Sequence, residues 1–400
     1  MAIDTGNYLA MQALSNLQVT LDQAAIAHGE SVRSMLIEHI QANGGIISFA
    51  EFMHLALYAP GLGYYTSGMR NFGTAGDFVT APEISDLFGH VMARQVLEVH
   101  EQTSTIGILE IGAGSGALAR AILSRFLSEN RPVEYSILEV SPDHADRQRE
   151  ALAGFDDAAG VRVRWLHGLP EAAVDGVIIA NEVLDALPVE RFRIGDTGVE
   201  QFAVTVAGDS FEFVTRSAPP AVRNAVCALQ ESLDTTLPPG YVSEVSLALP
   251  QWVREVATVL GRGLLLFSDY GYARRDYYAP ERHAGTLMCH LRHQAHSNPL
   301  LVPGLQDITA WVDFTAVAEA GTEAGLDLAG FTTQAHFLMG AGLADELAGA
   351  EQSEQVRRAA EIKTLTLPGE MGERFRFMGF TRGIIDPVAG FSLKDLRHTL

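Results

Sequence analysis

Three polar side chains follow a buried strand in the stretch VIIANEVLDALP, residues 177–188. The apolar run leads directly into Asn181, Glu182 and Asp185. Carboxylates gathered at one end of a sheet are costly unless they meet a cation, a proton or a ligand. We therefore expect this cluster to hold one of the three. The structural alternatives are that Asp185 caps a helix beginning near ALPVE and that Asn181 satisfies backbone groups.

A glycine-rich turn in ILEIGAGSGALARAIL, residues 108–123, is the strongest local pattern in the chain. The apolar run predicts a strand that leads into Gly112, Gly114 and Gly116, and a helix follows at once. Glycine permits a tight turn, and its missing side chain lets a ligand approach the backbone and the positive end of the helix. The turn therefore predicts a functional site, with a ligand-free turn as the alternative.

Three chemistries use such a turn. Dinucleotide binding fits because Gly112, Gly114 and Ala117 satisfy G-x-G-x-x-A. A nucleophile elbow fits because Ser115 is flanked at two residues by small side chains. A class I S-adenosylmethionine site has the pattern E/D-x-G-x-G-x-G, and all four of its places are filled here, by Glu110, Gly112, Gly114 and Gly116.

We rank these three chemistries by two acidic residues and by the absence of a second glycine-rich loop from the sequence. Glu110 lies two residues before the first glycine, and dinucleotide sites do not usually require an acid there. Glu139, at the end of the next strand, is positioned to accept both ribose hydroxyls of either nucleoside. A hydrolase needs an acid and a histidine, and Asp269 and His283 have a suitable order, but no second glycine-rich oxyanion loop is present. We therefore rank the methyl donor first, the dinucleotide second and the hydrolase third.

The elements that must position these residues begin at about residue 106, where strands start to alternate with helices. Such alternation predicts an α/β fold with a parallel, doubly wound sheet. The predicted strands are IGILEI, VEYSILEV, VRVRWL, DGVIIA and GLLLFSDYGY, and two more lie in LDLAGFTTQAHFLM and ERFRFMGFTRGI.

An inserted antiparallel hairpin is predicted over 189–215, and helices are predicted over about 219–233 and at PQWVREVATVL. Ahead of the sheet, SVRSMLIEHIQANGG predicts a helix, and Ser48 with Glu51 forms a capping box for the next one. We divide the chain into a lead-in (1–30), an N-terminal helical segment with cofactor-covering loops (31–100), a core (101–188 and 262–385), an insertion on the substrate side (189–261) and a C-terminal tail (386–400).

Composition excludes several classes of partner. The formal net charge is −21, and no basic stripe is visible, so we expect no nucleic-acid partner. No apolar run reaches the roughly 18 residues needed to cross a bilayer, so we expect no membrane partner. Cys227 and Cys289 stand alone, which indicates reducing surroundings. The opening residues carry acid but no Arg or Lys, which argues against a leader peptide. We therefore expect a cytoplasmic protein.

Seven motifs occur in one order: GLGYYTSG, GDFVTAPEIS, LEIGAGSG, IIANEVLDALPVERF, SDYGY, GTLMCHLRH and DITAWVDF. From about residue 31 to 383 the chain resembles the MidA family, which includes a mitochondrial complex I assembly factor that methylates arginine. The resemblance implies a class I methyltransferase fold, Rossmann-like, with seven strands in a mainly parallel sheet. It also implies that the last strand, FRFMGFTRG, is antiparallel and lies beside the sixth.

The implied cofactor is S-adenosyl-L-methionine, and the implied partner is a protein that presents arginine. Open α/β sheets bind ligands outside the carboxyl ends of their strands, so the resemblance puts Asn181, Glu182 and Asp185 beside the donor methyl group. Carboxylates can orient a planar guanidinium through paired N–H···O contacts and accept the proton that methylation releases. Glu182 is the first candidate for this role and Asp185 the second.

Further cofactor contacts follow from the same resemblance. The loop GDFVTAPEIS precedes the sheet, and its Gly76 and Glu83 are candidates for the methionine end of the cofactor. Glu83 has a structural alternative, since Thr80 and Glu83 also form a capping box. Gly168 and Leu169 follow the third strand, and we expect them beside the adenine ring.

One segment departs from the family pattern, because its GTLRAY appears here as GTLMCH. Nearby, His290, His293 and His296 share a helical spacing, but no acid or cysteine completes a ligand set, so we expect no metal site. Two alternatives to methyl transfer stay open, an NAD-type oxidoreductase and a non-catalytic assembly factor that binds S-adenosylmethionine.

Overall fold

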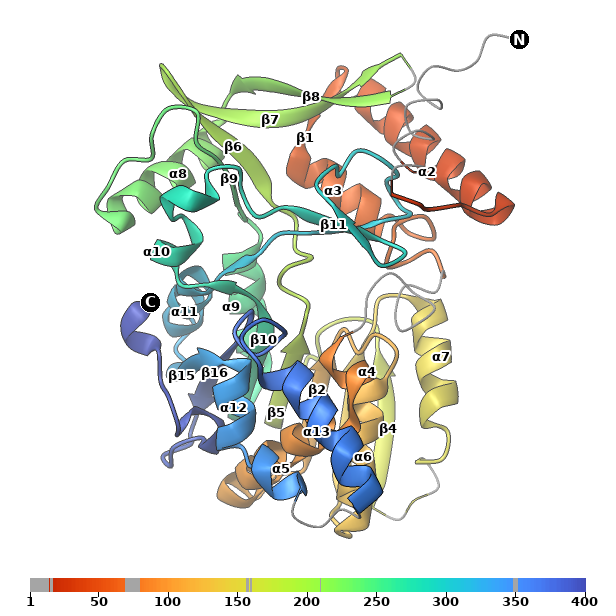
Figure 1. Cartoon of the computed structure of the whole chain (residues 1–400), viewed down its shortest axis with the longest axis vertical. Helices are drawn as coiled ribbons and strands as arrows, with labels where there is room; N and C mark the ends of the chain where they lie inside the picture. Colours follow the sequence, from red (N-terminus) through yellow and green to blue (C-terminus); the bar gives the residue numbers. More distant parts are fainter. Residues whose placement is uncertain are drawn as a thin grey trace. The chain divides into compact units, whose positions relative to one another are not determined.

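The computed structural model describes residues 14, 17–68, 80–155, 158, 160–208, 210–347 and 352–400 (Figure 1). Two compact units are present. Unit 1 comprises Met1–Phe78, Ala186–Leu249 and Arg275–Trp311, and unit 2 comprises Val79–Asp185, Pro250–Arg274 and Val312–Leu400. No helix among the described residues is both long enough and apolar enough to pass through a bilayer.

Unit 2 is built around a sheet whose strands run in the order β15-β16-β10-β5-β2-β3-β4. The strands from β10 to β4 are parallel, and β16 is antiparallel to both neighbours. The predicted seven-stranded fold with an antiparallel last strand is therefore confirmed, with a two-residue strand, β14 (Val312–Asp313), added beside β10. The bounds are β2 (Gly107–Ile111), β3 (Val133–Leu138), β4 (Val161–Leu166), β5 (Val174–Asn181), β10 (Leu260–Tyr272), β15 (Asp327–Thr333) and β16 (Phe375–Arg382).

The strands of this sheet are apolar because both faces are covered. Residues 177–180 of β5 are at most 1% exposed. Val177 and Ile179 belong to the same hydrophobic cluster as residues of α5 and α6. On β10, Leu266 belongs to that cluster, whereas the next residue, Phe267, contacts Trp252 of α9. Because alternate strand residues point to opposite faces, helices cover the sheet on both sides.

Helices of unit 2 follow strands in the predicted alternation, and α4 to α6 lie before and after the glycine turn. Their bounds are α4 (Ala81–Ile84), α5 (Asp86–Thr103), α6 (Ala117–Ser128), α7 (Pro142–Leu152), α9 (Leu249–Val259), α11 (Phe314–Glu323), α12 (Gln334–Gly340) and α13 (Gln352–Thr366).

Unit 1 contains the predicted hairpin as part of a five-stranded antiparallel sheet, in the order β1-β7-β6-β9 with β8 beside β7. Helix α2 begins before the predicted start at residue 31, because the side chain of Asp22 accepts the Ala25 N–H at 2.8 Å and caps it. The bounds are α2 (Gln23–Ala42), β1 (Ile46–Ser48), α3 (Phe49–Tyr58), β6 (Glu190–Gly195), β7 (Gly198–Ala207), β8 (Ser210–Ser217), α8 (Pro220–Leu233) and β9 (Val242–Val245).

The two units do not share the bounds of the predicted segments. Unit 2 takes in residues 79–100, because α5 packs on the core strands, and most of α9, because Trp252 packs on Phe267 of β10. Unit 1 takes in 275–311, where a small antiparallel sheet forms from β11 (Met288–Leu291), β12 (Gln294–His296) and β13 (Asp307–Thr309).

Candidate functional site

The carboxyl ends of the parallel strands meet at one edge of the unit 2 sheet. Ile111 of β2 is in register with Leu138 of β3 and Ala180 of β5, and Asn181 is in register with Ser268 of β10. Chemistry-bearing residues near these four strand ends are therefore neighbours, as the sequence predicts.

The glycine turn leaves β2 at this edge and enters α6. Gly112, Gly114 and Gly116 have φ values of 68°, 54° and 82°, in the left-handed region that glycine adopts without cost. Gly116 is the N-cap residue of α6, so the backbone of the turn leads straight to the positive end of that helix. At Gly112 a β-carbon would lie 3.1 Å from Val183. The turn thus needs glycine for its own conformation, and at its three glycines no side chain keeps a ligand away from the backbone.

Glu110, on β2, is 2% exposed and accepts the Tyr135 hydroxyl at 2.7 Å. Burial raises the pKa of Glu110 to about 7, and the charge of Glu139 adds to that rise, while the Tyr135 hydrogen bond opposes it. Glu110 is therefore held beneath the turn by a neutral donor on the neighbouring strand.

Glu139 directly follows β3, and its own N–H donates to the Leu166 carbonyl of β4. One carboxyl oxygen accepts the Ser141 N–H at 2.9 Å, and the other accepts the side-chain amide of Gln148 at 2.9 Å. Burial raises the pKa of Glu139, and these hydrogen bonds lower it. The orientation of this acid is therefore fixed from two sides.

Asp269, near the end of β10, organises the loop after β5. Its Oδ2 accepts the N–H groups of Val183 at 3.1 Å, Leu184 at 2.8 Å and Asp185 at 3.3 Å, and its Oδ1 accepts the Tyr270 N–H at 2.8 Å. Burial raises the pKa of Asp269 and these four donors lower it. Sequence reasoning assigned Asp269 only to a hydrolase, whereas the structure makes it the residue that shapes the loop carrying the acidic cluster.

Glu182 starts that loop in a left-handed conformation, with φ 54°, which is uncommon for a residue with a side chain. Its N–H donates to the Ser268 carbonyl at 2.8 Å, and its Oε1 accepts the Asn181 amide at 3.2 Å. Among the described residues, no salt bridge joins Glu182 to a cation. Burial raises the pKa of Glu182 to about 8, and the charges of Asp269 and Glu83 contribute to that rise.

Asp185 is 7% exposed and lies in the same loop. No helix starts there, since residues 182–189 form turns and irregular backbone, so the alternative of a helix cap at Asp185 is wrong. The charges of Glu182, Asp185 and Asp269 all raise the pKa of Tyr270, beyond the effect of burial. These three acids therefore all lie close to the Tyr270 hydroxyl.

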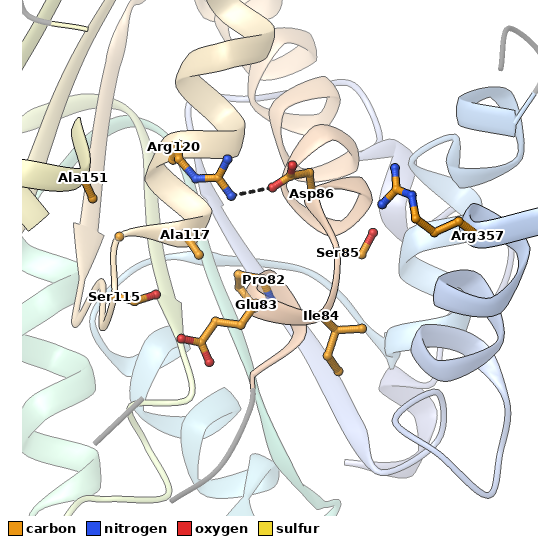
Figure 2. A pocket seen from close by; sticks show the side chains of 11 residues that line it. Pro82, Glu83, Ile84, Ser85, Asp86, Ser115, Ala117, Arg120, Ala151 and Arg357 are labelled. Atoms are coloured by element: carbon orange, nitrogen blue, oxygen red, sulfur yellow. Dashed lines mark hydrogen bonds and ion pairs between the residues drawn. The ribbon is translucent and has the colours of Figure 1, made fainter. Parts of the chain in front are cut away.

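Glu83 belongs to the short helix α4, and its side chain accepts the Thr80 N–H at 3.2 Å, as expected for a capping box. It also lines a pocket of about 420 Å³ with Ser115 and Gly116 of the glycine turn. Figure 2 shows Glu83 and Ser115 facing this space, and Arg120 paired with Asp86 at 2.8 Å beside it. Glu83 therefore serves the cap and lines a cavity next to the turn.

The remaining candidates have different outcomes. Gly168 is exposed and Leu169 half-buried, just beyond the end of β4. Gly76 lies outside the described residues. His290, His293 and His296 do not lie on a helix, because β11 and β12 form an antiparallel pair around a turn at Arg292 and His293. Within the described ranges, no group of three histidine, cysteine or acidic residues is arranged to hold a metal ion.

Comparisons with known proteins decide among the chemistries that use such a turn. Residues 91–332 match a family model described as "Putative S-adenosyl-L-methionine-dependent methyltransferase". The chain belongs to this family. The resemblance to the MidA family is thereby confirmed, and S-adenosyl-L-methionine is the cofactor of the family, so the dinucleotide and hydrolase interpretations of the glycine turn are set aside.

Relatives of this family match nearly the whole chain. It is 30% identical to a Drosophila melanogaster protein named protein arginine methyltransferase NDUFAF7 homolog, mitochondrial, covering 92% of this chain and 91% of that one. It is 26% identical to the Danio rerio protein arginine methyltransferase NDUFAF7, mitochondrial, covering 92% and 94%. A crystal structure of a Burkholderia thailandensis protein bound to S-adenosyl-homocysteine is 39% identical, with a TM-score of 0.89 and coverage of 96% and 100%.

The expected cytoplasmic compartment is contradicted by these names, since the curated relatives are mitochondrial proteins. Two isolated cysteines indicate reducing surroundings, but they do not distinguish one reducing compartment from another.

Two side chains near the glycine turn were not identified from the sequence. Gln148 of α7 is fully buried beneath the turn, and Trp165 of β4 donates its indole N–H to Gln148 at 3.0 Å. Neither belongs to a recognisable motif, because their contact joins a helix and a strand that are brought together only by folding.

Proposed function

We propose that this methyltransferase transfers methyl groups from S-adenosyl-L-methionine to the guanidinium of arginine in a protein partner. The proposal is supported by the curated relatives, which are named protein arginine methyltransferases and match about nine-tenths of the chain. The single observation that carries it is Glu182, a carboxyl among other carboxyls with no cation paired to it in the described part of the chain.

The residues at the sheet edge fit the cofactor. Three glycines with positive φ leave the turn open to a nucleoside, and Glu139 is oriented to accept its ribose hydroxyls. Gly168 and Leu169 follow the strand beside Glu139 and would flank the adenine ring. Glu83 lines the cavity next to the turn and would meet the methionine end of the cofactor, for which Gly76 is a second candidate. Glu110 would hold the turn from beneath.

The acidic loop supplies what an arginine acceptor requires. When bound, S-adenosyl-L-methionine supplies an electrophilic methyl group on a sulfonium. Glu182 would grip the guanidinium and localise its electrons on one nitrogen, and Asp185 would provide a second carboxyl beside it. Asn181 orients Glu182 through its amide. The raised pKa of Glu182 suits a group that holds a proton while the site is empty and loses it when a cation arrives.

The acceptor is tested directly by supplying the purified chain with S-adenosyl-L-methionine labelled on its methyl group, together with protein from the source cells. We expect the label to appear in methylated arginine after complete hydrolysis to amino acids. Label in another amino acid would overturn arginine as the acceptor. Tight binding of S-adenosyl-homocysteine with no incorporation would instead favour a non-catalytic assembly factor.

A further inference from the structure

A buried amide network lies beneath the glycine turn and connects three elements of unit 2. The side chain of Gln148 on α7 is 0% exposed. Its Nε2 donates to the Gly114 carbonyl at 2.9 Å and to Glu139 Oε2 at 2.9 Å. Its Oε1 accepts the indole N–H of Trp165 at 3.0 Å. One amide therefore joins the turn, the acid after β3 and a tryptophan of β4.

The orientation of this amide follows from the chemistry of its partners. An indole N–H can only donate, so the Gln148 atom that faces Trp165 must be the oxygen. A backbone carbonyl can only accept, so the atom that faces Gly114 must be the nitrogen. The two partners therefore require the same orientation of the amide, and its remaining N–H donates to Glu139. Trp165 is held in turn by the guanidinium of Arg149, which lies 5.0 Å from the centre of its ring.

We infer that Gln148 is a positioning residue for the cofactor: anchored by Trp165, it fixes the carboxyl of Glu139 and the Gly114 peptide in the arrangement that receives the nucleoside. The inference rests on the proposed role of Glu139. A neutral amide suits this task, because it donates to the acid without neutralising it, and Glu139 keeps the charge that ribose hydroxyls seek. A cation in the same place would form an ion pair with the acid and compete with those hydroxyls.

The sharpest test is Gln148→Glu, which keeps the shape and replaces the donor N–H by a carboxyl oxygen. Two adjacent carboxyls cannot both ionise readily, so one takes up a proton with a raised pKa. At about pH 5.5 the introduced carboxyl can donate its one proton to Glu139 and replace that hydrogen bond of the amide, although not the one to Gly114. At about pH 8 both groups tend to ionise and repel. Ionisable groups near the network include Glu110, whose pKa the charge of Glu139 raises, Arg149 beyond Trp165, and His144, which is buried one turn before Gln148 on α7.

We expect the Kd of this variant for S-adenosyl-homocysteine, measured by calorimetry, to be roughly tenfold or more higher at about pH 8 than at about pH 5.5. The unmodified chain should change by no more than about threefold over the same range. The matched control is Gln251→Glu on α9, where the exposed Gln251 amide likewise donates to a glutamate, Glu255, at 2.8 Å. A pH dependence of the Gln148→Glu variant equal to that of the control would overturn the inference.

A second variant protects the test against misfolding. Trp165→Phe leaves the amide in place and removes only its anchor, at a side chain that is not fully buried. We expect about fivefold weaker binding of S-adenosyl-homocysteine, as for one lost neutral hydrogen bond, and unchanged binding would count against the inference. Failure of the proposed cofactor-binding role of Glu139, on which the inference rests, gives a different result. In that case Glu139→Gln would bind as tightly as the unmodified chain, or the unmodified chain would bind no S-adenosyl-homocysteine at all.

Discussion

Two groups of carboxyls share one edge of the unit 2 sheet and have different surroundings. Glu110 lies on β2 and accepts a hydrogen bond from the Tyr135 hydroxyl. Glu139 follows β3 and accepts one from the Gln148 amide. Both donors are neutral side chains. Glu182, beyond β5, instead faces the charges of Asp269 and Glu83, and the side-chain amide of Asn181 donates to it.

The difference teaches what each group can bind. A carboxyl that is oriented by neutral donors is a fixed acceptor, suited to the hydroxyls of an uncharged sugar. A carboxyl placed among other carboxyls is poorly stabilised as an anion until a proton or a cation arrives. The first arrangement fits the nucleoside of the cofactor, and the second fits a guanidinium. The same residue type therefore serves two ends of one reaction because its neighbours differ.

The largest expected effect is at the cation end. Glu182→Gln should lower methyl incorporation by about 100-fold or more, because the variant can neither hold the guanidinium by charge nor take its proton. Binding of S-adenosyl-homocysteine should stay within about twofold, since the nucleoside end is untouched. Labelled-methyl assays and calorimetry measure the two quantities. Glu255→Gln on the exposed face of α9 is the matched control. Equal activity of both variants would remove Glu182 from the mechanism.

Asp269→Asn should have the next largest effect, on both stability and methyl incorporation. Its carboxylate accepts four backbone N–H groups, and an amide nitrogen in place of one oxygen would face donors with a donor. We expect a loss of about 1–3 kcal/mol in the free energy of unfolding, measured with denaturant, together with lower methyl incorporation. A variant with full activity and stability would show that the loop after β5 keeps its shape without Asp269.

At the nucleoside end, Glu139→Gln should weaken binding of S-adenosyl-homocysteine about tenfold, because charge-assisted hydrogen bonds to the ribose become neutral ones. At saturating cofactor the rate of methyl transfer should change little, since the acidic loop is intact. If the maximal rate fell as far as in Glu182→Gln, the division of labour between the two carboxyl groups would be wrong.

The smallest effect is a dependence of stability on pH. The pKa of Glu182 rises from 4.5 to about 8 on folding, and that of Glu110 from 4.5 to about 7. A carboxyl with a higher pKa in the folded chain keeps a proton that the unfolded chain has lost, so the free energy of unfolding falls as pH rises through this window. We expect the Tm of the cofactor-free chain to be lower at about pH 8 than at about pH 5 by roughly 2–4 °C.

Scanning calorimetry measures this difference in Tm, and Glu182→Gln should reduce it, because one of the carboxyls with a raised pKa is gone. A Tm that rises between these pH values would contradict the raised pKa of Glu182.

Much of the fold could be predicted because its strands are recognisable in the sequence from their hydrophobic pattern and their length. The run at residues 177–180 is apolar on both faces, as a central parallel strand requires, and the family motifs indicated that the final strand is antiparallel. The start of α2 was harder to predict, since its cap at Asp22 lies in weakly patterned sequence. The position of Asp185 in a loop was harder still to predict, because an acid that caps a helix and an acid in a loop have the same sequence pattern.

The glycine turn and the acids near the strand ends can be recognised from the amino-acid sequence, because conformational freedom and strand periodicity are local properties. The differences between those acids arise from tertiary contacts. The four N–H groups on Asp269 come mostly from a loop more than eighty positions away, and the donors to Glu139 come partly from a helix held by a strand tryptophan. Burial and neighbouring charge set the pKa of a carboxyl, and both arise only when distant segments pack together.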